Sequence, residues 1–256
     1  MICWDLIDWC MSLNKTRDMN DMSHATYLKQ REKIEHYFDR TAAQTWARLT
    51  SDAPVSGVRA TVRAGRDRMR STLLSYLPQD LSGKRLLDAG CGTGALSVEA
   101  AKRGAYVVAI DLSPTLVNLA RERTPAELGK GHIEFLSGDM FDPALGEFDF
   151  VVGMDSLIHY QPADVVRVLC GFAARTRDSI VFTFPPKNMA LAAMITVGKL
   201  FPRKDRAPFI APVAYEKLTG LIRNASGLSA FAVGRTQKIS SGFYTSQALE
   251  LKRVTP

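Results

Sequence analysis

The sequence predicts an α/β fold built on a mostly parallel sheet with helices on both faces. Short apolar strands alternate with helical segments from residue 84 onwards, and parallel neighbours need such helical crossovers. Two strands, residues 84–88 and 106–111, end in an acidic residue, and the first runs into a glycine-rich loop that opens a helix. A helix start of this kind presents backbone N–H groups to a ligand, so we expect the binding site at these strand ends.

The predicted elements follow one another in a regular order. The strands are expected at residues 84–88, 106–111, 133–136, 148–152, 179–184, 228–239 and 243–253. The helices are expected at residues 95–103, 163–174 and 213–225, and one begins at Pro114. The regular alternation ends at Pro185-Pro186, so residues 187–212 are expected to form an insertion.

Five segments describe the expected organisation. Residues 1–22 are a mobile extension, residues 23–80 an N-terminal helical cap, and residues 81–186 the core. Residues 187–212 are a helical lid and residues 213–256 the C-terminal part of the core. The cap is expected to contain a helix at 55–77, in which Arg59, Arg63, Arg66 and Arg70 share one face. That stripe is either a solvated helix face or a binding surface for acidic groups.

Composition narrows the class of protein. The 256 residues are 46% apolar and 23% charged, which suits a globular chain with a sizeable core. The net charge of +7 favours an acidic partner, but the sequence has no nucleic-acid-binding motif. The four cysteines form no CxxC pair, which indicates a reducing compartment. No apolar run is long enough to span a membrane, and the first residues do not form a secretory signal.

The glycine loop leaves two cofactor classes open when taken alone. Gly90-Cys91-Gly92-Thr93-Gly94-Ala95 nearly fits the dinucleotide pattern of nicotinamide enzymes. Asp111, about 20 residues further on, could accept hydrogen bonds from ribose hydroxyls in either case. The third and fourth strands also end in an acid, at Asp139 and Asp155. This set of strand ends favours S-adenosylmethionine (SAM) over a nicotinamide cofactor.

These motifs resemble those of the class I SAM-dependent methyltransferases over residues 81–254. The resemblance implies a Rossmann-like sheet with an antiparallel last strand. It places Gly90 and Gly92 beside the methionine part of SAM, while Asp88 holds the loop or the amino group. Asp111 would bind the ribose, and Asp139 and Met140 would frame the adenine. The full implied cofactor-binding set is Asp88, Gly90, Cys91, Gly92, Asp111, Leu112, Asp139, Met140 and Asp155.

A narrower resemblance covers residues 34–250. It is carried by residues 36–41 (HYFDRT), 46–49 (WARL), 155–160 (DSLIHY), 181–187 (VFTFPPK) and 198–203 (GKLFPR). Together these segments are similar to the magnesium-protoporphyrin IX O-methyltransferases of chlorophyll and bacteriochlorophyll synthesis. The resemblance implies methyl transfer from SAM to one propionate of magnesium protoporphyrin IX, with magnesium present only in the substrate. It further implies a partnership with the magnesium chelatase and a cytoplasmic location at or near the photosynthetic membrane.

The chemistry of the acceptor sets the expected roles of His159 and Tyr37. A propionic acid has a pKa of about 4.3, so the nucleophile is already ionised at neutral pH and needs no general base. We therefore expect these two catalytic candidates to align the carboxylate with the methyl group, and a purely structural role for each stays open. The alternatives are another acceptor, such as a quinone-type phenol that would need a base, or a non-catalytic tetrapyrrole carrier.

Overall fold

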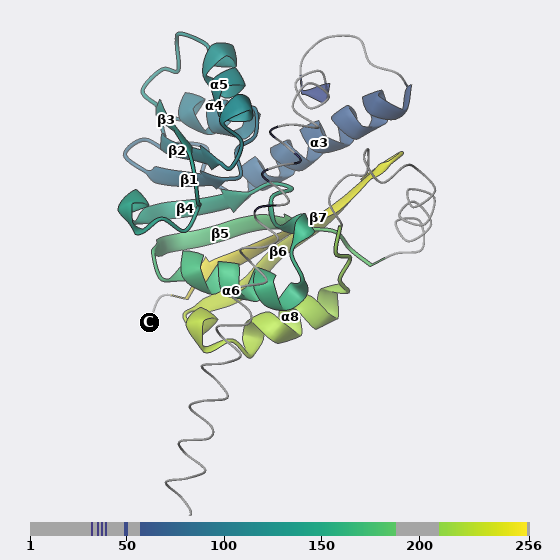
Figure 1. The fold of residues 1–256 in the computed structure, drawn as a ribbon. Coiled ribbons are helices and arrows are strands. Elements are labelled where there is room, and N and C mark those ends of the chain that lie inside the picture. Colours follow the sequence, from purple (N-terminus) through teal and green to yellow (C-terminus); the bar gives the residue numbers. More distant parts are fainter. Residues whose placement is uncertain are drawn as a thin grey trace, which may run out of the picture.

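The computed structural model describes Glu32, Glu35, Tyr37, Asp39, and residues 49–50, 57–187 and 210–254. Seven strands of these segments form one sheet in the order β3-β2-β1-β4-β5-β7-β6 (Figure 1). Their bounds are β1 Arg85–Ala89, β2 Tyr106–Asp111, β3 His132–Ser137, β4 Phe148–Gly153, β5 Thr176–Phe184, β6 Phe231–Ser241 and β7 Tyr244–Arg253. The first five strands run parallel, whereas β7 is antiparallel to β5 and β6. The prediction of a mostly parallel sheet with an antiparallel last strand is confirmed.

A tight hairpin reverses β7. The turn between β6 and β7 contains Gly242, whose φ of 55° lies in the left-handed region that glycine adopts without strain. Through this turn β7 inserts between β5 and β6, which buries its Ala248, Leu249 and Leu251.

Helices cover both faces of the sheet. The described helices are α3 Gly57–Ser75, α4 Ala95–Lys102, α5 Pro114–Arg123, α6 Pro162–Ala173 and α8 Tyr215–Arg223. Side chains of a strand alternate between the faces, so Leu86 packs in the core under α3 and α4, and Leu87 packs in the core under α6 and α8. Both leucines are fully buried. The sheet is thus the middle of three layers.

Two predicted elements begin two or three residues later in the structure, for the same kind of reason, whereas the strand predicted from 179 begins three residues earlier, at Thr176. The helix predicted from 213 begins at Tyr215, because Val213 forms a bridge with Pro186 instead. The strand predicted from 228 begins at Phe231, after the short 3₁₀ turn η5 (Ser226–Leu228). Apolar pattern alone could not separate these connections from the elements that follow them.

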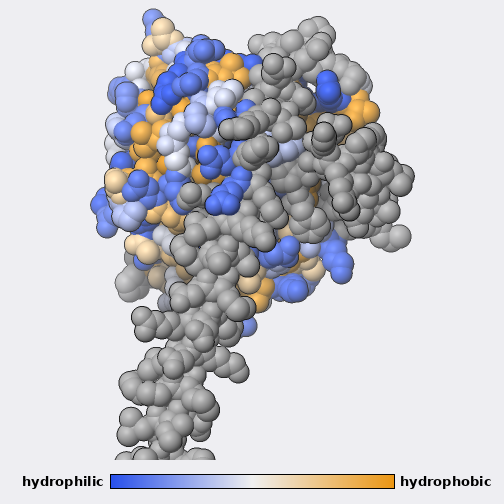
Figure 2. Space-filling model, viewed as in Figure 1, coloured by the Kyte–Doolittle hydropathy of each residue, from blue (hydrophilic) through white to orange (hydrophobic). Residues whose placement is uncertain are grey.

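The expected extension (1–22), most of residues 23–56 of the expected cap and residues 188–209 of the expected lid lie outside the described residues. Within the part of the chain that the structure describes, no helix is long and apolar enough to cross a membrane. The large apolar side chains exposed there lie on different elements, at Val58, Tyr106, Leu221, Phe243 and Val254. Figure 2 shows hydrophilic and apolar residues intermingled over the side of the molecule formed by α4 and α5.

Candidate functional site

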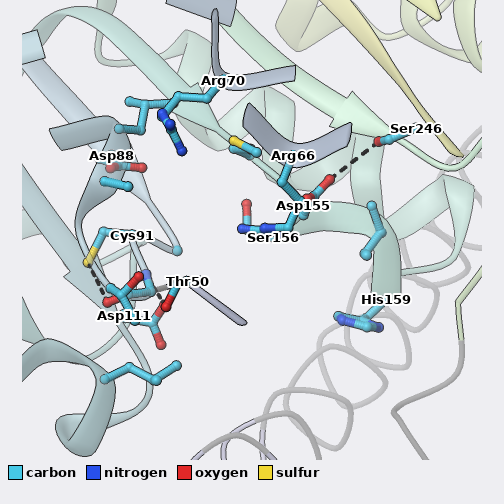
Figure 3. A pocket seen from close by; sticks show the side chains of 18 of the residues that line it. Thr50, Arg66, Arg70, Asp88, Cys91, Asp111, Asp155, Ser156, His159 and Ser246 are labelled. Atoms are coloured by element: carbon cyan, nitrogen blue, oxygen red, sulfur yellow. Dashed lines mark hydrogen bonds and ion pairs between the residues drawn. The ribbon is translucent and has the colours of Figure 1, made fainter. Parts of the chain in front are cut away.

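A cavity of about 570 Å³ opens at the carboxyl ends of the parallel strands. Its floor comes from the ends of β1, β2 and β4, and its walls come from α3, from β7 and from the 3₁₀ turn η3 (Leu157–His159). All nine residues that the sequence assigned to the cofactor line this cavity, and so do Tyr37 and His159. The fold therefore brings the whole predicted set to one site (Figure 3).

The glycine loop contains three left-handed residues, of which Gly94 (φ 77°) caps α4 and the other two shape the loop itself. Gly90 has a φ of 84° and Gly92 a φ of 53°. The Gly90 and Cys91 N–H groups both donate to the Ile110 carbonyl, at 2.8 and 3.0 Å, which pins the loop against β2. A Cβ on Gly90 would lie 2.4 Å from the Ser156 Cβ, whereas one on Gly92 would meet nothing within 4 Å. Gly90 is therefore required by close packing and Gly92 by its backbone conformation.

Two acids at strand ends hold the loop and the helix that follows it. Asp88 at the end of β1 is 1% exposed and accepts a hydrogen bond of 2.6 Å from the Ser97 hydroxyl of α4. Asp111 at the end of β2 accepts from the Gly92 N–H at 2.8 Å and from the Ser113 N–H at 3.0 Å. Burial raises the pKa of Asp88 to about 7 and also raises the pKa of Asp111. A cationic ligand in the cavity would favour the ionised form of both.

The Cys91 thiol is not an activated nucleophile. Burial raises its pKa well above the usual range, and the carboxylates of Asp111 and Asp88 raise it further. The thiol stays protonated at neutral pH, so Cys91 contributes packing to the loop rather than a thiolate. On the adenine side of the expected site, Asp139 accepts from the Phe141 N–H at 2.9 Å, which turns the chain after β3. Met140 in this turn and Leu112 after β2 both line the cavity.

Asp39 ties the N-terminal segment to the start of α5. One oxygen of its carboxylate accepts hydrogen bonds from the Ser113 hydroxyl (3.1 Å), the Thr115 N–H (3.3 Å) and the Thr115 hydroxyl (2.7 Å). A carboxylate at a helix N-terminus is stabilised by the unpaired N–H groups there. This contact lies two residues from Tyr37, which lines the cavity and whose pKa is raised by burial. Tyr37 is therefore held in the wall as a neutral phenol.

His159 belongs to the turn that follows β4. It is 7% exposed and lines the cavity, and the adjacent Ile158 carbonyl accepts from the Ala211 N–H at 3.0 Å. In Figure 3 His159 lies across the cavity from Cys91 and Asp111. An imidazole in this place faces the end of the cavity away from the glycine loop.

Asp155 is held by protein groups. It has a φ of 55°, which is uncommon for a residue with a side chain. Its carboxylate pairs with the Arg66 guanidinium at 2.5 Å and accepts from the Tyr244 hydroxyl at 3.1 Å and the Ser246 hydroxyl at 3.3 Å. The Thr183 hydroxyl accepts from the Asp155 N–H at 2.7 Å. The network joins α3, β4, β5 and β7 at one wall of the cavity.

Sequence reasoning placed Asp155 among the cofactor residues and missed its partners. The available signals were the arginine stripe of α3 and the alternation of Tyr244 and Ser246 on one face of β7. The interpretation of the stripe as a solvated face was wrong for Arg63, Arg66 and Arg70, which are half-buried and line the cavity. It holds for Arg59, which is exposed. The stripe faces inward because Gly65 packs directly on Tyr244, where a Cβ would lie 2.5 Å from the ring.

Comparisons with known proteins agree with this geometry. Residues 153–253 match the family model of the magnesium-protoporphyrin IX methyltransferase C-terminus, and residues 86–178 match a general methyltransferase domain. The chain is 51% identical to the magnesium-protoporphyrin O-methyltransferase of Rhodobacter capsulatus, over 88% of this chain and 98% of the relative. It is 30% identical to the enzyme of the same name from Synechocystis, over 88% of this chain and 97% of the relative.

The fold comparison gives the same result. The crystal structure of magnesium protoporphyrin IX methyltransferase from Synechocystis PCC 6803 with bound SAH superposes with a TM-score of 0.75 at 27% identity. It covers 87% of this chain and 99% of that one. The chain therefore belongs to the magnesium-protoporphyrin O-methyltransferase family.

Proposed function

We propose that this chain transfers a methyl group from SAM to a propionate of magnesium protoporphyrin IX and gives the monomethyl ester in chlorophyll or bacteriochlorophyll synthesis. One observation carries the proposal: 51% identity over nearly the whole length of a magnesium-protoporphyrin O-methyltransferase. The cavity supports it, because the glycine loop and half-buried arginines of α3 line the same space.

The glycine-loop end of the cavity fits SAM. Gly92 leaves open space where a side chain would stand, so a ligand can approach the loop backbone. Asp111 at the end of β2 can accept from ribose hydroxyls beside its two backbone donors. Asp139 and Met140 lie where the adenine is expected, at the end of the neighbouring strand β3. When bound, SAM supplies an electrophilic sulfonium methyl group.

The α3 end of the cavity fits an acidic, largely apolar acceptor. Arg63 and Arg70 stand one turn on either side of Arg66, so cationic groups line this wall over about two helical turns. Guanidinium groups bind carboxylates in a fixed geometry, which suits the two propionates of a porphyrin. The exposed Phe243 and the half-buried Ile210 add apolar surface to the lining of the cavity. Lys187, which ends the VFTFPPK segment, is exposed and is not among the residues that line the cavity.

Catalysis in this arrangement rests on positioning. The acceptor carboxylate is ionised at neutral pH, so the chain needs to align it and exclude water rather than remove a proton. Tyr37 can donate one hydrogen bond to a carboxylate because its raised pKa keeps it protonated. His159 lines the same cavity. We assign both residues to alignment of the acceptor.

Further parts of the proposal concern the surroundings of the site. Residues 23–80 form a cap over the cavity, residues 187–212 a lid, and residues 81–186 with 213–256 the SAM-binding core. The cap is supported by the contact of Asp39 with α5 and by the position of Tyr37 in the cavity wall. Partnership with the magnesium chelatase and peripheral membrane contact follow from the expected pathway and from the net charge of +7.

The direct experiment is chromatography of the products formed by the purified protein from SAM and magnesium protoporphyrin IX. The expected result is a single monomethyl ester and one equivalent of S-adenosylhomocysteine. Esterifying both propionates beforehand should abolish turnover. Methylation of the fully esterified porphyrin, or turnover only with a phenolic acceptor, would show that the acceptor is wrong.

A further inference from the structure

One buried hydroxyl in the cavity wall has no partner. Ser156 Oγ, Ser179 Oγ and Arg175 Nε are the buried side-chain nitrogen or oxygen atoms of the described residues that lack a hydrogen bond. Of these three residues, Ser156 alone lines the cavity. Buried polar groups in folded proteins are almost always hydrogen-bonded, so an exception at a binding site calls for a functional explanation.

Ser156 is wedged against the glycine loop. Its Cβ lies 2.4 Å from the position of a Cβ built on Gly90, and its Oγ lies 3.3 Å from that position. The Oγ also lies 3.1 Å from the position of a Cβ built on Gly153, the last residue of β4. Two glycines therefore make room for this side chain. In Figure 3 Ser156 lies between Asp155 and the loop that carries Cys91.

The neighbours of Ser156 indicate which ligand it would contact. The preceding carboxylate, Asp155, is occupied by Arg66, Tyr244 and Ser246 on the far wall. Ser156 instead contacts Gly90, which the family pattern places beside the methionine part of SAM. The hydroxyl is buried in its present rotamer. Because Ser156 itself lines the cavity, a change of its χ1 rotamer is the motion that would turn the hydroxyl toward a ligand.

We propose that the Ser156 hydroxyl binds the amino-acid end of SAM. This group carries an ammonium and a carboxylate, and a hydroxyl can accept from the first and donate to the second. The inference rests on the proposed use of SAM as methyl donor. It makes Ser156 a positioning residue: by fixing the methionine arm it sets the direction of the sulfonium methyl group toward the acceptor.

Two ligands that differ only in the amino-acid end test the contact. S-adenosylhomocysteine has the full arm, whereas 5′-methylthioadenosine ends in a methyl group at the same sulfur. Calorimetric titration of Ser156→Ala should show about tenfold weaker binding of S-adenosylhomocysteine, the loss of a hydrogen bond to a charged group. The affinity for 5′-methylthioadenosine should equal that of the wild type.

Ser179→Ala is the matched control. It removes an equally buried and unpartnered hydroxyl from β5, outside the cavity, and should bind both ligands as the wild type does. Thermal unfolding gives a second readout. Removing an unpartnered hydroxyl should leave the melting temperature of either ligand-free variant unchanged or raised, whereas removing a structural hydrogen bond would lower it. The upward shift produced by S-adenosylhomocysteine should shrink only in Ser156→Ala.

The outcomes separate this inference from the proposed function. A wild-type protein that binds neither ligand contradicts the use of SAM itself. A wild type that binds both, with Ser156→Ala unchanged or weakened equally for both, overturns the role of Ser156. A variant that binds S-adenosylhomocysteine normally but loses affinity for magnesium protoporphyrin would move Ser156 to the acceptor side, and also overturns it. Should Ser156→Ala melt lower, the ratio of its two affinities still decides, because it compares ligands on one folded protein.

Discussion

Replacing Asp155 by Asn tests the polar network that joins α3 to the sheet. Asn is almost the same size as Asp and tolerates the left-handed φ of 55°, so the backbone conformation should persist. What is lost is the negative charge that balances Arg66. The side chains of Asp155 and Arg66 are 8% and 20% exposed, so water can recover only part of the lost interaction.

The magnitude follows from this burial. Removing one partner of a buried ion pair costs about 3–5 kcal/mol, because the remaining charge loses its opposite charge. Because Arg66 is partly exposed, we expect the free energy of unfolding to fall by an amount near the lower limit, about 3 kcal/mol. A chain of this size loses roughly 2–4 °C of melting temperature per kcal/mol, so Asp155→Asn should melt roughly 6–12 °C lower.

The assay is thermal and urea unfolding, with two reference variants. Asp178→Asn breaks a surface pair with Lys252, whose side chains are 39% and 53% exposed, and should cost less than about 1 kcal/mol. Adding Arg66→Gln to Asp155→Asn should recover part of the lost free energy of unfolding, because it removes the positive charge that Asp155 balanced. The reasoning would be refuted by an Asp155→Asn protein as stable as Asp178→Asn, or by additive losses in the double variant.

Three further predictions concern ligand binding and turnover. Burial raises the pKa of Asp88 to about 7 and the SAM ammonium favours its ionised form, so SAM binding should release protons near pH 7; calorimetry in buffers of different ionisation enthalpy should detect the release, and Asp88→Asn should reduce it. Asp111→Ala should weaken SAM binding by about 1.5–3 kcal/mol, since ribose hydroxyls lose a charged acceptor; an unchanged titration would argue against ribose binding. His159→Phe and Tyr37→Phe should lower kcat without altering its dependence on pH between about 6 and 8. If kcat of the wild type rises with pH at about 6.5 and this rise is lost in His159→Phe, His159 is a general base.

The parts of the fold that depend on local pattern were predictable from the sequence. The strand at 106–111 was predicted to the residue, because five apolar or aromatic positions end in an acid before a proline-initiated helix. The glycine loop and the acids at the strand ends came together because parallel strands end at the same edge of the sheet. These features are fixed by neighbours in sequence.

The Arg66–Asp155–Tyr244 network was not predictable in the same way. Its members lie 89 residues apart on each side of Asp155, and nothing local to any one of them identifies the others. The arginine stripe of α3 could have faced solvent, and its direction is set by the close packing of Gly65 on Tyr244. The absence of a hydrogen-bond partner for the Ser156 hydroxyl also depends on tertiary packing. The side chain lies against two glycines that come from different parts of the chain, Gly90 in the loop after β1 and Gly153 at the end of β4.

The Arg66–Asp155 pair also bears on the rate of methyl transfer. The reaction joins a carboxylate to a sulfonium methyl group and yields a neutral ester and a neutral thioether, so charge is lost on the way to the transition state. A bare guanidinium at the acceptor would stabilise the ionised ground state more than the transition state and would slow the step. Asp155 balances the charge of Arg66, which leaves the guanidinium able to orient a carboxylate without holding it strongly. Asp155→Asn should therefore lower both the KM for the porphyrin and kcat when assayed below its melting temperature. A raised KM with an unchanged kcat would show instead that the pair only shapes the binding wall.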